Sequence, residues 1–271
     1  MKILNRAIDT IKLFYTQRNI LITLIIRDFK SRYFSSFIGL PWAFVQPAVY
    51  VFVIWFAFTF GLRAGNTATG VPFAPWLLVG MIPWLFISQT MIVGCMALPE
   101  YAYLIKKTSF NVSFIPIIKI FSGMIVHVIM IFLVIIILIF SFQIYPTIYW
   151  IQIIYYLFAT FILLTGISLF VASVNVFIHD MAHIVNIITT MLFWATPIIY
   201  PFTMLKGNYR YIALLNPFFY ITEGYRYTFI EKVWFFEFVE MNIYFWSVTA
   251  FIFIVGVFTF QKLKADFGDV L

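Results

Sequence analysis

Charged residues are scarce in this sequence of 271 residues. Asp, Glu, Lys and Arg make up 10% of the chain, and hydrophobic residues make up 64%. An ordinary soluble domain carries roughly 25% charged residues. So few charges cannot cover the surface of a soluble fold of this length, which excludes that class. The sequence therefore predicts an integral membrane protein that crosses the bilayer several times.

The net charge of +7 does not indicate a nucleic-acid partner. The basic residues border the apolar runs and do not gather into one long stretch of the kind that binds phosphate backbones. We therefore expect membrane lipids as the surroundings of this chain, and no nucleic acid.

Several kinds of chemical site are also missing. The single cysteine, Cys95, cannot form a disulfide within the chain, and no GxxxxGK[ST] loop that would hold nucleotide phosphates occurs. His179 and His183 are four residues apart but lack a third ligand for a metal. His127, alone in an apolar run, is interpreted as a packed or pore-facing polar residue, with a proton relay as the alternative. We expect no metal and no cofactor bound by this chain.

The apolar runs hold no central Asp, Glu, Lys or Arg. Proton- or sodium-coupled transporters usually need such a group to carry the coupling ion, so this absence disfavours secondary transport. No constellation of reactive side chains is visible either. The sequence therefore predicts a protein that is not itself an enzyme and has no catalytic residues.

What the sequence does contain is a series of apolar runs long enough to cross a bilayer. A helix needs about 20 residues for this, and Pro83 is expected to break or kink the second run. The 60 residues between Ile120 and His179 are too many for one helix, so a hairpin turn is expected at Gln143–Pro146. Six spans are predicted: Leu40–Leu62, Pro72–Leu98, Lys119–Ser141, Tyr149–Val176, Ile184–Tyr200 and Met241–Phe260.

The predicted fold is all-α, with one transmembrane domain over residues 1–271. Lys and Arg concentrate before the first span, between the second and third spans and in the tail, and the positive-inside rule places these parts in the cytoplasm. Both termini are therefore predicted to be cytoplasmic. The chain divides into a cytoplasmic tail with a surface helix (1–36), spans one to five (37–204), an external segment (205–240), the sixth span (241–261) and a cytoplasmic tail (262–271).

A helix along the membrane surface is predicted before the first span. Its apolar residues recur at helical spacing and share one arc: Ile22, Ile25, Ile26, Phe29, Tyr33 and Phe37. Its charged residues are Arg27, Asp28, Lys30 and Arg32, of which Asp28 and Arg32 form a favourable pair four residues apart. Gly39 and Pro41 then predict a bend into the span. The alternative is a basic segment that only sets the orientation of the chain.

Aromatic residues are abundant in the spans. Belts at the membrane interface and bulk facing lipid account for many of them. The alternative is a pore wall whose flat rings stack on sugars. The candidates for that wall are Trp42, Tyr50, Trp55, Phe56, Trp84, Trp194 and Tyr200.

Four stretches of the sequence resemble a known family. They are LIIRDFKSRYFSSFIGLPWAFVQP (24–47), LIKKTSFNVSFIP (104–116), GISLFVASVNVFIHDMAHIVNIITTMLFWATPIIYP (166–201) and LLNPFFYITEGYRYTF (214–229). In this order, over nearly the whole chain, they resemble the permease subunit of type-2 ABC exporters, in the branch that exports lipid-linked polysaccharides such as O-antigen, capsule and teichoic acid. The chain departs from that pattern at His179, where Arg is common, and at Asn111, where Pro is usual. These departures concern local contacts.

The resemblance implies a homodimer driven by two copies of a separate ABC ATPase subunit, which would use ATP and Mg. It implies coupling to that ATPase through the surface helix and the connection between spans two and three, at Arg27, Asp28, Lys30, Arg32, Pro99, Glu100, Tyr101, Lys106 and Lys107. It also implies short external helices near the pore exit, which act as a gate and include Asn216, Pro217, Glu223 and Arg226.

The function that follows is export of a lipid-linked polysaccharide across the cytoplasmic (inner) membrane, with this chain as the transmembrane subunit. Two alternatives stay open at this point. One is a type-2 ABC exporter of a drug or a small lipid. The other, less favoured, is a membrane scaffold for glycan synthesis that needs neither a pore nor an ATPase.

Overall fold

The computed structural model describes residues 15–34, 37, 39–61, 70–107 and 110–271, without the side chains of Tyr33 and Lys107. All regular elements within these ranges are helical. They are α2 (Arg18–Tyr33), α3 (Trp42–Phe56), the π-helix η1 (Ala57–Gly61), α4 (Phe73–Cys95), α5 (Ala97–Glu100), α6 (Ala102–Lys107), α7 (Phe114–Phe142), η2 (Ile148–Gln152), α8 (Ile153–Asn175), α9 (Met181–Ala195), η3 (Phe202–Met204), α10 (Asn208–Leu214), α11 (Pro217–Arg226), the π-helix η4 (Tyr227–Glu231), α12 (Val239–Leu263), η5 (Lys264–Asp266) and α13 (Phe267–Val270).

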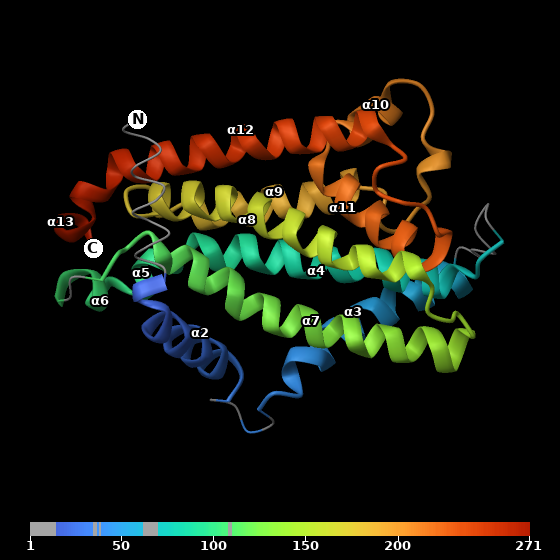
Figure 1. Ribbon diagram of the computed structural model, residues 1–271, viewed down its shortest axis with the longest axis horizontal. Coiled ribbons are helices and arrows are strands. Elements are labelled where there is room, and N and C mark those ends of the chain that lie inside the picture. Colours follow the sequence, from blue (N-terminus) through green and yellow to red (C-terminus); the bar gives the residue numbers. More distant parts are fainter. Residues whose placement is uncertain (1–14, 35–36, 38, 62–69, 108–109) are drawn as a thin grey trace.

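Five helical stretches in the described ranges are long and apolar enough to cross a membrane: 42–61, 73–95, 114–142, 148–175 and 239–270. They run roughly side by side along the long axis of the molecule (Figure 1). The elements α2, α5, α6 and α13 gather at one end, and α10 and α11 lie at the other. The all-helical membrane fold predicted from the sequence is therefore confirmed.

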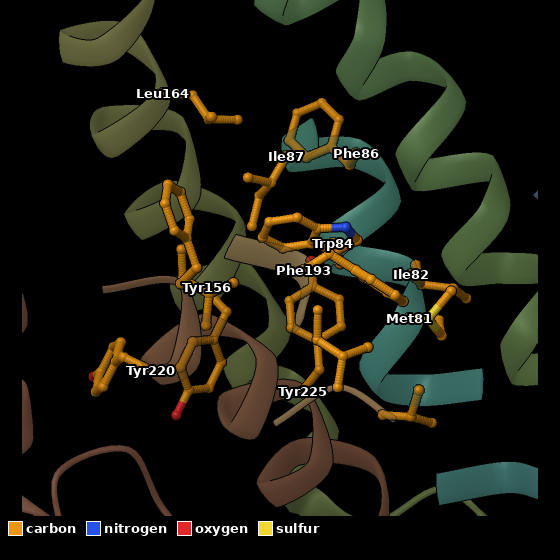
Figure 2. Packing of buried hydrophobic residues seen from close by; sticks show 14 of the residues in the cluster. Met81, Ile82, Trp84, Phe86, Ile87, Tyr156, Leu164, Phe193, Tyr220 and Tyr225 are labelled. Atoms are coloured by element: carbon orange, nitrogen blue, oxygen red, sulfur yellow. The ribbon is translucent and has the colours of Figure 1, made fainter. Parts of the chain in front are cut away.

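Helix α4 forms the centre of the bundle. It packs against α7, α8, α9 and α11, and 67% of its apolar stretch is buried. The buried core around α4 contains Trp84, Phe86 and Ile87 of α4 together with Tyr156 of α8 and Phe193 of α9 (Figure 2). Only 6% of the corresponding stretch of α3 is buried. The first span therefore lies against the bundle and not inside it.

The tightest helix pair is α8 with α12, because glycines face each other where they cross. A Cβ atom on Gly256 would overlap the backbone of Gly166, and a Cβ atom on Gly166 would overlap the backbone of Phe253. Small residues allow close approach of helix backbones in membranes. This pair fixes the last span to the fourth.

The hairpin predicted at Gln143–Pro146 is confirmed. Helix α7 ends at Phe142, and Gln143 adopts a left-handed conformation with φ of 57°. The next helical turn, η2, begins at Ile148. A break or kink was predicted at Pro83. The break is wrong, since α4 continues through Pro83 as one helix, and the kink stays a prediction. Neighbouring helices on nearly all sides hold α4 together and outweigh the loss of one backbone donor.

The predicted fifth span differs most from expectation. Helix α9 has 15 residues and ends at Ala195, which is shorter than the predicted Ile184–Tyr200. Thr196 is extended, with φ of −89° and ψ of 133°, because Pro197 disfavours the helical region for the residue before it. Residues 196–199 are nonetheless buried. A non-helical stretch of turns and bends, residues 196–200, therefore follows α9.

Candidate functional site

The surface helix α2 is attached to the start of α7 by apolar contacts. Leu21 and Leu24 are buried and pack against Phe114 and Ile118 of α7. Ile22 and Ile26, on the predicted apolar arc, remain exposed. Ile25 of the same arc packs partly against this contact, so the arc that the sequence assigns to lipid overlaps in part with the face that contacts α7.

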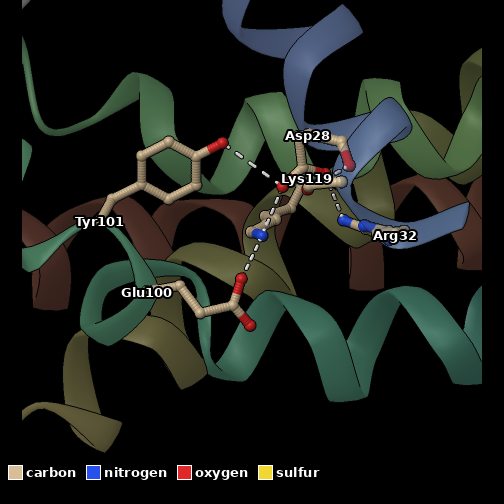
Figure 3. Close-up of polar contacts among 6 residues, drawn as sticks. Asp28, Arg32, Glu100, Tyr101 and Lys119 are labelled. Carbon is tan, nitrogen blue, oxygen red and sulfur yellow. Dashed lines mark hydrogen bonds and ion pairs between the residues drawn. The ribbon is translucent and has the colours of Figure 1, made fainter. Parts of the chain in front are cut away.

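A cluster of charged side chains lies beside this contact, and Figure 3 shows it. The ammonium of Lys119, from α7, donates to carboxylate oxygens of both Asp28 on α2 and Glu100 on α5. Arg32 pairs with the other oxygen of Asp28 at 2.7 Å. The Tyr101 hydroxyl donates to Asp28 at 3.3 Å. We call these five residues the coupling cluster.

Burial strengthens the electrostatic interactions between the charged side chains of the coupling cluster. The side chains of Asp28 and Lys119 are each 3% exposed. Burial alone raises the pKa of Asp28, but the positive charges of Arg32 and Lys119 outweigh it and hold that pKa below its ordinary value. Burial and the negative charge of Asp28 raise the pKa of the Tyr101 hydroxyl. Asp28 is thus charged and Tyr101 neutral at physiological pH.

The coupling cluster joins three separate parts of the chain. Asp28 and Arg32 come from α2, Glu100 and Tyr101 from the connection between α4 and α7, and Lys119 from α7. A buried ion pair resists separation because either partner alone would be left as an uncompensated charge. The Asp28–Lys119 pair, in which both side chains are 3% exposed, therefore ties α2 to α7, and Glu100, which is 49% exposed, adds a partly solvated link to the connection.

The residues predicted to couple to an ATPase divide into two groups. Asp28, Arg32, Glu100 and Tyr101 meet in the coupling cluster. Those outside it are Pro99, half-buried in α5, and Arg27, Lys30 and Lys106, which are exposed, while the side chain of Lys107 is outside the described part of the structure. Sequence reasoning did not assign Lys119 to this site. The sequence did contain an indication of this role, because Lys119 is the one charged residue at the start of an otherwise apolar span.

A second feature is an open groove between α3, α4 and α9, with a volume of about 690 Å³. Its aromatic lining includes Trp42 and Tyr50 of α3, Trp84 of α4, and Phe193 and Trp194 of α9. The rings of Tyr50 and Trp84 lie 6.1 and 6.0 Å from the ring of Phe193, which is between them. We call these three rings the aromatic layer.

Four of the seven predicted channel residues therefore line this groove: Trp42, Tyr50, Trp84 and Trp194. Trp55 and Phe56 do not, and they pack with Phe52 and Phe60 along α3 and η1. Tyr200 lies beyond the groove, where its hydroxyl donates to the Trp194 carbonyl at 2.8 Å. The groove also has a polar lining that sequence reasoning missed: Gln46, Ser88, Gln89, Asn186, Thr189 and Thr190.

The predicted gate residues organise the opposite end of the molecule. Asn216 caps α11, accepting from the Phe218 amide at 3.0 Å, and its own amide donates to Thr196 at 2.7 Å. Pro217 occupies the first turn of α11, where its fixed φ favours the helix and its missing N–H costs nothing. Asn216 thus joins α11 to Thr196, the residue directly after α9.

Arg226, at the end of α11, is completely buried. It pairs with Glu223 at 2.7 Å and donates to the carbonyls of Pro197 and Ile198 at 2.8 and 2.7 Å. Its guanidinium also lies 3.5 Å from the centre of the Trp76 ring. Arg226 therefore supplies hydrogen bonds to backbone carbonyls of the non-helical residues 196–200 that follow α9.

Comparison with known proteins gives a family match for this chain. The family described as ABC-2 type transporter matches residues 20–230, from the surface helix through η4. The chain belongs to the ABC-2 type transporter family. This family provides the membrane-spanning permease of an ABC transporter, so the chain is a multi-pass membrane subunit that works with an ABC ATPase.

Individual relatives of this ABC-2 chain cover almost its whole length. An O-antigen export system permease protein RfbA of Klebsiella pneumoniae is 27% identical over 257 residues, covering 93% of this chain and 95% of that protein. A second Klebsiella pneumoniae protein of the same name is 25% identical, with the same coverage. A protein of that name from Myxococcus xanthus is 28% identical over 226 residues, covering 80% of this chain and 82% of its own length.

Proposed function

We propose that this chain is the transmembrane subunit of an ATP-driven exporter that moves a lipid-linked polysaccharide of the O-antigen type across the inner membrane. The observation that carries the proposal is the similarity to O-antigen export permeases along almost the whole chain. The open groove with aromatic and amide lining supports it, because flat rings and amides are the groups that recognise sugars.

The proposed assembly is a homodimer of this chain with two copies of a separate ABC ATPase. The ATPase would bind ATP and Mg, since this chain has no phosphate-binding loop of the GxxxxGK[ST] type. The small buried share of α3, 6% of its apolar stretch, supports a second copy beside it. The grooves of two copies, facing each other, would enclose the channel.

The coupling cluster would transmit the ATPase cycle. In this proposal the ATPase docks on the α5–α6 connection, at Pro99, Glu100, Tyr101, Lys106 and Lys107. Movement of that connection pulls on Lys119 and on Asp28 across the buried ion pairs. Helix α2, with Arg27 and Lys30 on its exposed side, then acts as a lever that turns at Gly39, where the chain has a positive φ of 69°.

The proposed topology has six crossings with both termini in the cytoplasm and α10 and α11 as external gate helices. Helix α9 alone spans about 22 Å at 1.5 Å per residue, short of the ~30 Å hydrocarbon core. The non-helical residues 196–200 would complete that crossing. Non-helical backbone at this depth needs partners, and Arg226 supplies them to Pro197 and Ile198.

Deletion of the gene tests the proposal. We expect surface polysaccharide to disappear and lipid-linked glycan to accumulate inside the cell, with both effects reversed by the wild-type chain. The purified chain alone should not hydrolyse ATP, whereas the complex with its ATPase should. Unchanged surface polysaccharide, together with loss of drug or phospholipid efflux, would assign the exporter to a different substrate.

A further inference from the structure

Three carboxamide side chains in the groove have no hydrogen-bonding partner among the described residues. They are Gln46 of α3, Gln89 of α4 and Asn186 of α9, and all are exposed in the groove. Among the described residues none of them makes a side-chain hydrogen bond. The hydroxyls next to them differ, because Ser88 and Thr190 donate to backbone carbonyls of their own helices. We call the three amides the amide layer.

The amide layer lies to one side of the aromatic layer. Helices α3 and α9 run in the same direction and α4 runs against them (Figure 1). Gln46 precedes Tyr50 by four residues, Asn186 precedes Phe193 by seven, and Gln89 follows Trp84 by five. At 1.5 Å per residue these offsets are about 6, 11 and 8 Å. All three amides are thus displaced toward the end that carries α2 and the coupling cluster.

Unpartnered amides within apolar spans require a polar occupant. A carboxamide without a hydrogen-bonding partner costs roughly 1–3 kcal/mol when buried, and more in hydrocarbon. The amides therefore face water, a solute or polar groups of another chain, and not lipid tails. The volume of about 690 Å³ is in the ordinary range of roughly 300–1,000 Å³ for sites that bind small ligands.

The lining of the groove also contains no Asp, Glu, Lys, Arg or His. A sugar hydroxyl both donates and accepts, as a carboxamide does, so the two match without any charge. A carboxylate or phosphate on the sugar would lose hydration there and find no cation to replace it. The groove therefore suits an uncharged sugar and disfavours an acidic one.

We propose that the amide layer and the aromatic layer form a binding site for uncharged sugar rings at the cytoplasmic side of the channel, and that the exported glycan has a neutral repeat unit. In this site Gln46, Gln89 and Asn186 bind hydroxyls, and the rings of Tyr50, Trp84 and Phe193 contact sugar C–H faces further along the path. The inference rests on the proposed function and specifies the substrate class within it.

The composition of the exported glycan is the first test. The polysaccharide that disappears from the surface on deletion of the gene is isolated, and its repeat unit is analysed for uronic acids and phosphate. A neutral repeat unit is expected. An acidic or phosphorylated repeat unit would overturn the inference while leaving the export function intact, and a surface glycan unaffected by the deletion would instead remove the proposed function.

Export by amide variants is the second test. Gln89→Leu and Asn186→Leu keep the side-chain volume but lose the amide, and each is expected to lower the export rate about fivefold, the factor of one net hydrogen bond. Ser247→Ala on α12 is the control, because that hydroxyl lies outside the groove and bonds within its own helix at 2.7 Å, and it should export normally. Normal export by both Leu variants at normal expression would contradict the site.

A photo-crosslinking residue separates the sugar from a second copy as the occupant. It is placed at Thr190 in the groove, and at Phe251 on the exposed side of α12 as a control, in the complete transporter during export. A glycan adduct at position 190 alone is expected. Crosslinks between two copies of the chain, without glycan, would show that the amides serve dimer packing and would overturn the proposal.

Discussion

At the scale of single residues, Lys119 holds together the end of the molecule that carries α2, α5 and α6. It is buried between the carboxylates of Asp28 and Glu100 and lies 5.1 Å from the centre of the Tyr101 ring. An ammonium in such a place is stable only because both carboxylates compensate it. Its removal therefore leaves a buried carboxylate behind.

The variant Lys119→Ala tests this dependence. We expect a loss of about 3–5 kcal/mol in the free energy of unfolding, the usual cost of breaking a buried ion pair from one side, measured by chemical unfolding of the purified chain in lipid nanodiscs. The control is Lys106→Ala, at an exposed position of α6, which should change stability by less than about 0.5 kcal/mol. Equal values for the two variants would refute the role of Lys119.

Protonation of Asp28 should release α2 in acid. The folded pKa of this carboxyl lies below its ordinary value of 3.8, so the ionised group stabilises the docked state above that pH, and the contribution is lost as pH falls through the folded pKa. Spin labels on Thr23 and Tyr103, both exposed, should keep their separation down to about pH 4 and move apart below it. The transition should be absent in Asp28→Asn, and a midpoint above about pH 5 would contradict this assignment.

One single-residue prediction from sequence was confirmed where chemistry acts locally. Asn216, assigned to an external gate by resemblance, caps α11, and its part in a gate stays a prediction. Asp28 was expected to pair with Arg32 four residues on, and it does. Lys119 was not expected to join them, because its partners are 91 and 19 residues away in sequence. The same applies to the amide layer, which comes from three helices.

At the scale of elements, the connection between α2 and α3 determines whether α2 can act as a lever. Gly39 has a φ of 69°, and no atom outside its chain neighbours lies within 4 Å of the position that a Cβ would take. The backbone conformation, and not a lack of space, therefore restricts which residues can occupy position 39. A residue other than Gly, Asn or Asp is strained by about 1–2 kcal/mol in this conformation.

Two substitutions at Gly39 separate the backbone effect from the size of the side chain. Gly39→Leu should lower export several-fold while membrane insertion and ATPase docking stay intact. Gly39→Asn, which tolerates a positive φ, should export at close to the wild-type rate. The measurements are surface polysaccharide and co-purification of the ATPase. Normal export by Gly39→Leu would mean that the bend is only a turn.

Most helices could be predicted from hydrophobic length, and the exceptions have physical reasons. The π-helix η1 was not expected. The fifth span was expected to continue to Tyr200, whereas α9 ends at Ala195, and of the break or kink expected at Pro83 the break did not occur. In both places contacts from distant elements determine the backbone, and a pattern along one chain does not contain them.

At the scale of the whole molecule, the contrast between α3 and α4 predicts where a second copy lies. Val53 of α3 and Ile187 of α9 are 55% and 61% exposed, although both belong to the faces on either side of the groove. A double variant Val53→Cys with Ile187→Cys should crosslink between copies in the membrane. The pair Phe132→Cys with Phe251→Cys, exposed on α7 and α12, should not. Cys95 is fully buried and leaves the assay undisturbed.

The burial of Arg226 also has a consequence for the biogenesis of the protein. The carbonyls of Pro197 and Ile198 receive their hydrogen bonds from a side chain 29 and 28 residues further along the chain. Until α11 has folded against the end of α9, these carbonyls lack that donor, and an unsatisfied backbone group in a bilayer costs several kcal/mol. We therefore expect the fifth span to insert stably only together with α11.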